Sequence, residues 1–256
     1  MNIRLFKVLP LKINGFIFLF SLLVFALLIK LGLWQLDRAE QKDLRLEKMQ
    51  LYQQQASMSL NDILKLMAQK GSVKVGDEEF NDLPVTLSGT LDNKHKFLLD
   101  NQVYKGGQGY RVIQLFRDEI SGVTVLVNLG WVHGGIDRSY IPEIPDITGQ
   151  VEFSGKIRVM EPSMVLEDEV LQSSSWPQRI QSIDNNKISQ LLAKPLLPFI
   201  VYVDNDDSLG YIKEWVPIVM PPEKHRGYAF QWFSLAIAWF ILMLSASYKS
   251  ASKNEQ

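Results

Sequence analysis

The sequence predicts a membrane protein in which one transmembrane helix at each end flanks a β-rich domain with a few helices, an α+β arrangement. Two windows of the 256-residue chain are strongly apolar, although the mean hydropathy of the whole chain is only −0.01. Between the windows, short runs of alternating apolar and polar residues are separated by turn residues, which is the pattern of strands in an antiparallel barrel or sandwich.

The first apolar window runs from Ile13 to Trp34, and we place a transmembrane helix at residues 13–36. Its one charged residue, Lys30, lies near the predicted outer end, where a long side chain reaches the membrane surface. A cleaved signal peptide is the alternative, because basic residues precede the window. No small-residue cleavage site follows the window, so the sequence favours an uncleaved anchor.

The second apolar window runs from Tyr228 to Tyr248, and we place a second transmembrane helix at residues 225–248. A buried core helix is the alternative, since hydrophobicity on all sides fits both. The position of the window favours a span. It ends in a short polar tail, and aromatic residues cluster at its start, as they do at a membrane boundary.

Basic residues on the flanks predict the orientation of the two spans. Arg4, Lys7 and Lys12 precede the first span without an acidic residue, and Lys249 and Lys253 follow the second. We therefore expect both ends in the cytoplasm and the middle on the outer face of a cell inner membrane, in the periplasm. The predicted segments are a cytoplasmic N-terminus at 1–12, a β-rich domain at 37–224 and a cytoplasmic tail at 249–256.

The outer segment begins with a charged, helical stretch at residues 37–70, whose first part can continue the membrane helix outward. Ser59, followed three residues later by Asp62, resembles a capping box and predicts the start of a second short helix. From Leu83 onwards the period changes to two, and a further helix is expected near Asn185–Leu192. The expected strands cover residues 84–91, 96–100, 110–117, 123–132, 150–159 and 198–204.

Composition excludes several kinds of chemistry. The chain has no cysteine, so disulfides, thiolate catalysis and cysteine-bound metal clusters are ruled out. Its three histidines, His95, His133 and His225, do not have the spacing of metal-binding pairs. A net charge of −1 gives no general attraction to nucleic acid, and no such partner is expected. No hydrolase, nucleotide-binding or zinc-protease motif is present, so the sequence offers no catalytic constellation, and we expect no protein-built metal site.

Two loops resemble ligand sites but are better explained as turns. Residues 105–109 contain three glycines between expected strands and open no helix that would bind phosphate. Residues 204–207 carry oxygen ligands without the glycine and distal glutamate of a calcium loop. We also expect His95 to be exposed in a loop, and His133 to be exposed or structural at a Gly-Gly turn.

His225 lies where the chain enters the second predicted span, and Pro222 just before it favours helix initiation. At 100° per residue, one face of this helix carries an imidazole, two alanines and large aromatic rings. Such a groove accepts a flat apolar macrocycle with the histidine as axial ligand. The alternative is that the small residues mark helix–helix packing while the aromatic residues anchor at the interface. The residues on this face are His225, Tyr228, Ala229, Trp232, Ala236, Trp239 and Met243.

Four stretches, taken in order, resemble motifs of the SURF1 family, called Shy1 in yeast. Residues 32–42 are similar to its G-x-W-Q-x-x-R-x-x-x-K after the first span, and residues 109–112 to a glycine-led strand. Residues 125–132 resemble V-L-V-N-R-G-W-V, and residues 225–233 resemble H-x-x-Y-A-x-Q/T-W-[FY]. The matching positions are Gly32, Trp34, Gln35, Arg38, Gly109, Gly130, Trp131, His225, Tyr228, Ala229 and Trp232. The chain departs from the motifs at Leu129, His133 and Lys224, where arginine, proline and asparagine are common.

The resemblance implies a non-enzymatic assembly factor for a haem–copper (cytochrome c) oxidase that acts at haem a insertion. It implies transient binding of haem a, with His225 as the candidate iron ligand and Tyr228 and Trp232 as walls of the groove. Expected partners are the catalytic subunit of the oxidase, the haem a delivery machinery and membrane lipid. Gly130 and Trp131 would belong to the core or the docking surface of the outer domain. A cofactor-free membrane scaffold is the alternative function, and a membrane-anchored enzyme is a third.

Overall fold

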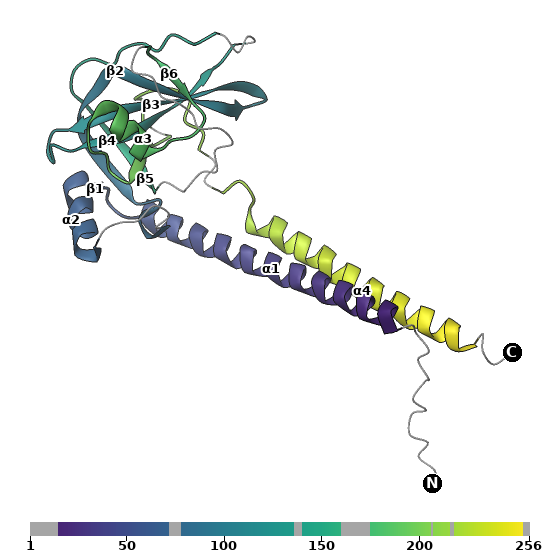
Figure 1. Ribbon diagram of the computed structural model, residues 1–256. Helices are drawn as coiled ribbons and strands as arrows, with labels where there is room; N and C mark the ends of the chain where they lie inside the picture. Colours follow the sequence, from purple (N-terminus) through teal and green to yellow (C-terminus); the bar gives the residue numbers. More distant parts are fainter. Residues whose placement is uncertain are drawn as a thin grey trace. The chain divides into compact units, whose positions relative to one another are not determined.

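The chain divides into a helical unit, residues 1–48 and 216–256, and a β unit, residues 49–215 (Figure 1). A computed structural model describes residues 15–71, 78–135, 140–159, 175–205, 207–215 and 218–252.

Two long helices dominate the helical unit: α1, Gly15–Gln53, and α4, Pro222–Ser252. α1 and the part of α4 from Pro222 to Ala246 are each long and apolar enough to cross a membrane, by length and composition. Only 11% of each apolar window is buried, whereas the core helix of a soluble domain is mostly buried. α1 continues without a break from its apolar part into the charged sequence beyond residue 36, ending at Gln53.

The two helices run antiparallel (Figure 1). They meet along a seam that includes several small buried residues. On α4 the buried residues His225, Ala229 and Ala236 follow one another at intervals of four and seven residues, which is a heptad spacing. A side chain on Gly32 would begin 2.6 Å from the ring of Phe233, so the glycine makes room for that ring. The rings of Phe25 and Phe240 pack at a tilt of 43° with their centroids 5.9 Å apart. The buried seam residues are Ser21, Gly32 and Ala39 on α1, and His225, Ala229 and Ala236 on α4.

The β unit contains one seven-stranded mixed sheet. β2, β3, β4, β7 and β5 pair in that order, and β5 pairs again with the first half of β2, so these five strands form a ring. The short strands β1 and β6 also pair with β2. The strands are β1 (Met58–Ser59), β2 (Pro84–Tyr104), β3 (Gly107–Asp118), β4 (Thr124–His133), β5 (Val151–Val159), β6 (Gln178–Ile180) and β7 (Phe199–Val203).

The expectation of an antiparallel barrel or sandwich is too specific. β4 pairs with β7 in parallel, and both β1 and β6 run parallel to β2. Parallel neighbours need a crossover connection, and the chain between β4 and β7 supplies one that includes β5, β6 and the helix α3, Asn185–Leu192. A pairing that skips so many residues leaves no mark on the local alternation of apolar residues, so the pattern alone did not reveal it.

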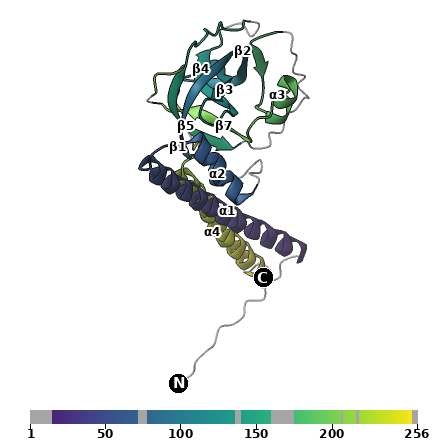
Figure 2. The same ribbon diagram turned by 90° about the vertical axis from the view of Figure 1, so that its left-hand side faces the viewer.

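Each face of the sheet carries an apolar core, and one helix belongs to each core (Figure 2). Val112 and Phe116 of β3 point into the larger core, which includes Leu60 and Ile63 of the helix α2, Leu60–Lys70. Ile113 and Leu115 of β3 point to the opposite face, into a second core that contains Ile188 of α3. This alternation on a two-residue period is what the sequence predicted for these strands.

Local sequence signals for the helices and turns are confirmed. The Ser59 hydroxyl accepts a hydrogen bond from the backbone N–H of Asp62 at 3.2 Å and caps α2. α3 has the predicted bounds, and the Asp184 carboxylate caps its first turn. Residues 105 and 106 form the hairpin turn between β2 and β3. The short helix η1, Glu78–Phe80, was not predicted, and the predicted turn at 204–207 lies partly outside the described residues.

His95 does not lie in an exposed loop, so that prediction is wrong. It is part of β2, and its side chain is 18% exposed. The pairing of β2 with β3 shifts register between Leu91 and Lys96, so the strand bulges where the sequence suggested a turn. The imidazole then packs edge-on against Trp176 at 4.8 Å. His133, at the end of β4, is exposed as expected.

Candidate functional site

The helical unit brings Gln35 of α1 and His225 of α4 together, although 190 positions separate them. His225 lies in the first turn of α4, and its side chain is buried with 8% exposure. Its Nδ1 atom is 2.7 Å from the Oε1 atom of Gln35. A carboxamide oxygen only accepts hydrogen bonds, so in this arrangement Nδ1–H donates. A neutral imidazole then keeps the lone pair on Nε2, which is the form that binds metals.

Two further contacts fix the register of the helices around this hydrogen bond. Arg226, next to His225, forms an ion pair with Asp43 of α1. Further along the seam, the indole N–H of Trp239 donates to the backbone oxygen of Ser21 at 3.1 Å. Both contacts hold α4 against α1, so the imidazole and the carboxamide face each other in a defined geometry.

The alanine-containing face of α4 packs against α1. Ala229 and Ala236 are each 1% exposed, and Trp239 contacts Ser21. Helix–helix packing, the alternative considered from the sequence, therefore accounts for this stripe. A flat macrocycle has no room at the alanines in this arrangement.

The aromatic motif residues of the helices are less buried than the seam residues. Tyr228 is 42% exposed, Trp232 is half-buried and Trp34 is 48% exposed. The guanidinium of Arg38 lies 5.9 Å from the Trp34 ring and donates to Gln41 at 2.7 Å. These rings are available to lipid or to a ligand on the outside of the helix pair.

In the β unit, the mid-chain motifs also meet. Gly109 of β3 lies beside the indole of Trp131 on β4, and a side chain on this glycine would begin 2.5 Å from that ring. The indole N–H donates to the backbone oxygen of Gln102 at 2.9 Å. Tyr104 and His133 pack against the same ring at 5.2 and 5.9 Å. Trp131 is 7% exposed, so it belongs to the core rather than to an open docking surface.

Gly130 lets a distant segment dock beside Trp131. Its φ of +120° disfavours any residue with a side chain, and a Cβ there would lie 2.8 Å from the backbone of Tyr211 and Ile212. The backbone N–H of Trp131 donates to the oxygen of Ile212 at 2.6 Å. The motif at residues 125–132 thus builds a bulged strand that anchors the segment leading to Trp215.

Arg111, within the second motif, has a role that sequence reasoning did not single out. Its guanidinium stacks on Trp215 at 4.3 Å, and its Nε–H donates to Gln102 at 3.0 Å. Burial lowers the pKa of this arginine, and the nearby Tyr202 partly opposes that effect. The cation–π contact stabilises the charge in place of a carboxylate partner.

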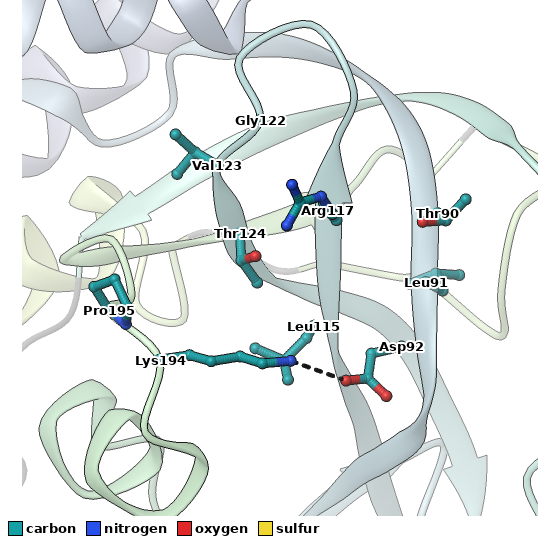
Figure 3. A pocket seen from close by; sticks show the side chains of 10 residues that line it. All are labelled: Thr90, Leu91, Asp92, Leu115, Arg117, Gly122, Val123, Thr124, Lys194 and Pro195. Carbon is teal, nitrogen blue, oxygen red and sulfur yellow. Dashed lines mark ion pairs between the residues drawn. The ribbon is translucent and has the colours of Figure 1, made fainter.

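A cavity of about 500 Å³ opens on the β unit between β2, β3, β4 and the loop after α3 (Figure 3). Arg117 and Lys194 project over a floor that includes Leu115, and Lys194 lies 3.8 Å from the carboxylate of Asp92. None of these residues belongs to the motifs. Among the described residues, no group of three or more His, Cys, Asp or Glu side chains is arranged to hold a metal ion.

A model of the SURF1 family matches residues 22–237, which is more than four-fifths of the chain and includes all four motifs. This chain belongs to the SURF1 family. The family is one of cytochrome oxidase assembly factors rather than catalysts, so an oxidase subunit is the implied partner. The two apolar helices agree with membrane anchoring in this family. No individual curated protein matches the chain.

Only part of the arrangement around His225 fits haem a. The donor at His225 fits, because metal-bound histidines commonly hold their second ring nitrogen in a hydrogen bond. The covered alanine face does not fit, since α1 fills it. With His225 only 8% exposed, ligation requires neighbouring side chains to move, and the aromatic rings that remain open on the same helix are Tyr228 and Trp232.

Proposed function

We propose that this SURF1-family protein aids haem a insertion into the catalytic subunit of a haem–copper (cytochrome c) oxidase while anchored in the membrane. The observation that carries the proposal is the pairing of two family motifs at Gln35 and His225. With Nδ1 engaged by the Gln35 oxygen, Nε2 is the ring nitrogen left to bind iron. The imidazole lies at the start of α4, where a membrane-embedded cofactor would meet the outer surface.

In this proposal, His225 provides an axial ligand to haem a, and Tyr228 and Trp232 contact the macrocycle from the same helix. The bound haem is cargo for the oxidase, so this chain performs no reaction on it. Binding through one histidine suits a carrier that must release its cargo, because a second axial ligand would lengthen its residence.

The proposed topology places both chain ends in the cytoplasm and the β unit in the periplasm, with α1 and α4 in the cell inner membrane. Arg4, Lys7 and Lys12 before α1 support this orientation. The β unit would then be free to contact the oxidase catalytic subunit and the haem a delivery machinery outside the membrane.

The test is the absorption spectrum of the full chain, purified in detergent from cells that also make haem a. We expect a haem signal in the native protein and a loss of at least several-fold in His225→Ala. His133→Ala is the matched control, since it removes an exposed histidine of the β unit. Equal haem signals in His225→Ala and the native protein would exclude His225 as the ligand.

A cofactor-free scaffold is the second candidate, and one observation favours it. The imidazole of His225 already has a partner in Gln35, and the alanines beside it are covered by α1. Under this alternative, the native protein carries no haem, and oxidase assembly still depends on the chain. Under the leading proposal, both haem binding and assembly depend on His225.

A further inference from the structure

The hydrogen bond between Gln35 and His225 affects the packing of the helices and also which ring nitrogen of His225 carries the proton. A neutral imidazole has two tautomers, and the partner of one nitrogen determines where the proton resides. Gln35 offers its carboxamide oxygen to Nδ1 at 2.7 Å, and this atom has no proton to donate. With the carboxamide in this orientation, the pairing requires the proton on Nδ1.

We propose that Gln35 is a positioning residue that holds His225 in the Nδ1-protonated tautomer and so leaves the Nε2 lone pair as the one that can bind a haem iron. The inference rests on the proposed haem a binding for its functional consequence, but the tautomer itself is a property of the haem-free protein. Without the acceptor, both tautomers would be populated. In the other tautomer Nε2 carries the proton, and the free lone pair on Nδ1 points at α1, where no ligand can reach it.

The neighbouring contacts indicate that Gln35 orients His225 and is not needed to hold α1 and α4 together. The ion pair between Arg226 and Asp43, and the packing of Phe233 on Gly32, already join the helices on either side of the hydrogen bond. Loss of one neutral hydrogen bond from such a seam leaves these contacts intact. The specific consequence of losing this hydrogen bond is that the imidazole ring of His225 no longer has a partner that orients it.

The experiment uses the full chain labelled with ¹⁵N-histidine in lipid nanodiscs, without haem, at a pH where His225 is neutral. Nitrogen chemical shifts separate a protonated ring nitrogen from an unprotonated one, and the signal that disappears in His225→Ala identifies residue 225. Gln35→Leu removes the acceptor at similar size, and Gln35→Glu restores an acceptor at the same place. Gln41→Leu is the matched control, because Gln41 lies on α1 and bonds Asp37 and Arg38 instead.

We expect the native protein and Gln41→Leu to show a protonated Nδ1 and an unprotonated Nε2. Gln35→Leu should give a mixture of tautomers, and Gln35→Glu should restore the native pattern. In haem-loading experiments, Gln35→Leu should weaken haem retention by about 10- to 100-fold, as expected for loss of a partner that orients a metal ligand.

A native spectrum with an unprotonated Nδ1, or a tautomer that Gln35→Leu leaves unchanged, would overturn the inference. Either result leaves the proposed function standing if haem binding still depends on His225. Conversely, equal haem binding by His225→Ala would remove the proposed ligand, while a tautomer that changes in Gln35→Leu would still show that Gln35 positions the ring.

Discussion

Gly109 is the residue at which β3 passes closest to the indole of Trp131. A Cβ at this position would lie 2.2 Å from the backbone oxygen of Val132 and 2.5 Å from the indole ring. We predict that Gly109→Ala destabilises the β unit by about 1–3 kcal/mol, because the backbone must shift to admit the methyl group. The unfolding midpoint in denaturant, followed by tryptophan fluorescence, measures this effect.

Gly107 in the same hairpin is the control for Gly109. Its nearest neighbour to a new Cβ is the Tyr104 oxygen at 3.4 Å, an ordinary contact. Gly107→Ala should leave the unfolding midpoint nearly unchanged. Equal destabilisation by both variants would show that the hairpin responds to any loss of glycine and that Trp131 has no special role.

Asp92 is the residue whose titration should govern the acid stability of the bulge in β2. Its carboxylate accepts hydrogen bonds from the Lys94 and His95 backbone and contacts the His95 ring at 2.8 Å. Burial acts to raise the pKa of Asp92, but the hydrogen bonds from His95 and Lys94 prevail and hold the pKa below its ordinary 3.8. Because the folded-state pKa is depressed, the stabilisation is complete above pH 3.8 and is lost as pH falls through the folded value.

We predict that Asp92→Ala lowers the free energy of unfolding by about 1–3 kcal/mol at neutral pH. The difference from the native protein should shrink as the pH falls below 3.8. Glu143→Ala, which removes an exposed carboxylate, serves as the control. Denaturant melts at several pH values provide the measurement, and a constant difference down to the lowest pH would contradict the role given to the carboxylate.

At the scale of elements, the register of α1 against α4 is the feature that positions His225. The chain has no cysteine, so introduced pairs report this register without background. We predict that Phe25→Cys with Phe240→Cys cross-links efficiently with a short bifunctional thiol reagent, since the centroids of the two rings lie 5.9 Å apart. Phe25→Cys with Phe230→Cys should fail, because position 230 is 74% exposed and about 15 Å further along the helix.

Cross-linking of the control pair at the rate of the seam pair would mean that the helices slide or that another register is populated. The hydrogen bond between Gln35 and His225 would then have no fixed geometry.

For the helix pair, the sequence predicted the two helices but not the contact between them. Apolar length predicted both helices, and the spacing of Ala229 and Ala236 predicted a common face. The pattern on α4 did not reveal which surface would cover that face. The partner is α1, and its Gly32 and Gln35 were recognised as motif residues without a connection to α4. Such a contact depends on the antiparallel register, which no local pattern encodes.

The β unit shows the same division between local and non-local information. Strands, the Ser59 cap, α3 and the hairpin at 105–106 follow from local propensity and turn chemistry. The parallel pairing of β4 with β7 brings together residues far apart in the chain, and His95 lies in a bulge that resembles a turn in sequence. Both errors arose where tertiary pairing overrides local preference.

At the scale of the whole molecule, the proposed topology makes a direct prediction. Ile120 lies at the turn after β3 and is 69% exposed, so Ile120→Cys should react in intact cells with a thiol reagent that crosses the outer membrane but not the inner membrane. Ser252→Cys, beyond the second apolar segment, should react only after the inner membrane is permeabilised. Labelling of both positions in intact cells would contradict a cytoplasmic C-terminus.

Assembly of the oxidase is the central claim, and a deletion strain of the source organism tests it most directly. The measurement is the haem a content and activity of the purified oxidase, with the native chain, His225→Ala or His133→Ala supplied from a plasmid. We predict that the deletion lowers both quantities severalfold, that the native chain and His133→Ala restore them, and that His225→Ala does not. An oxidase with normal haem a content and activity in the deletion strain would contradict the account.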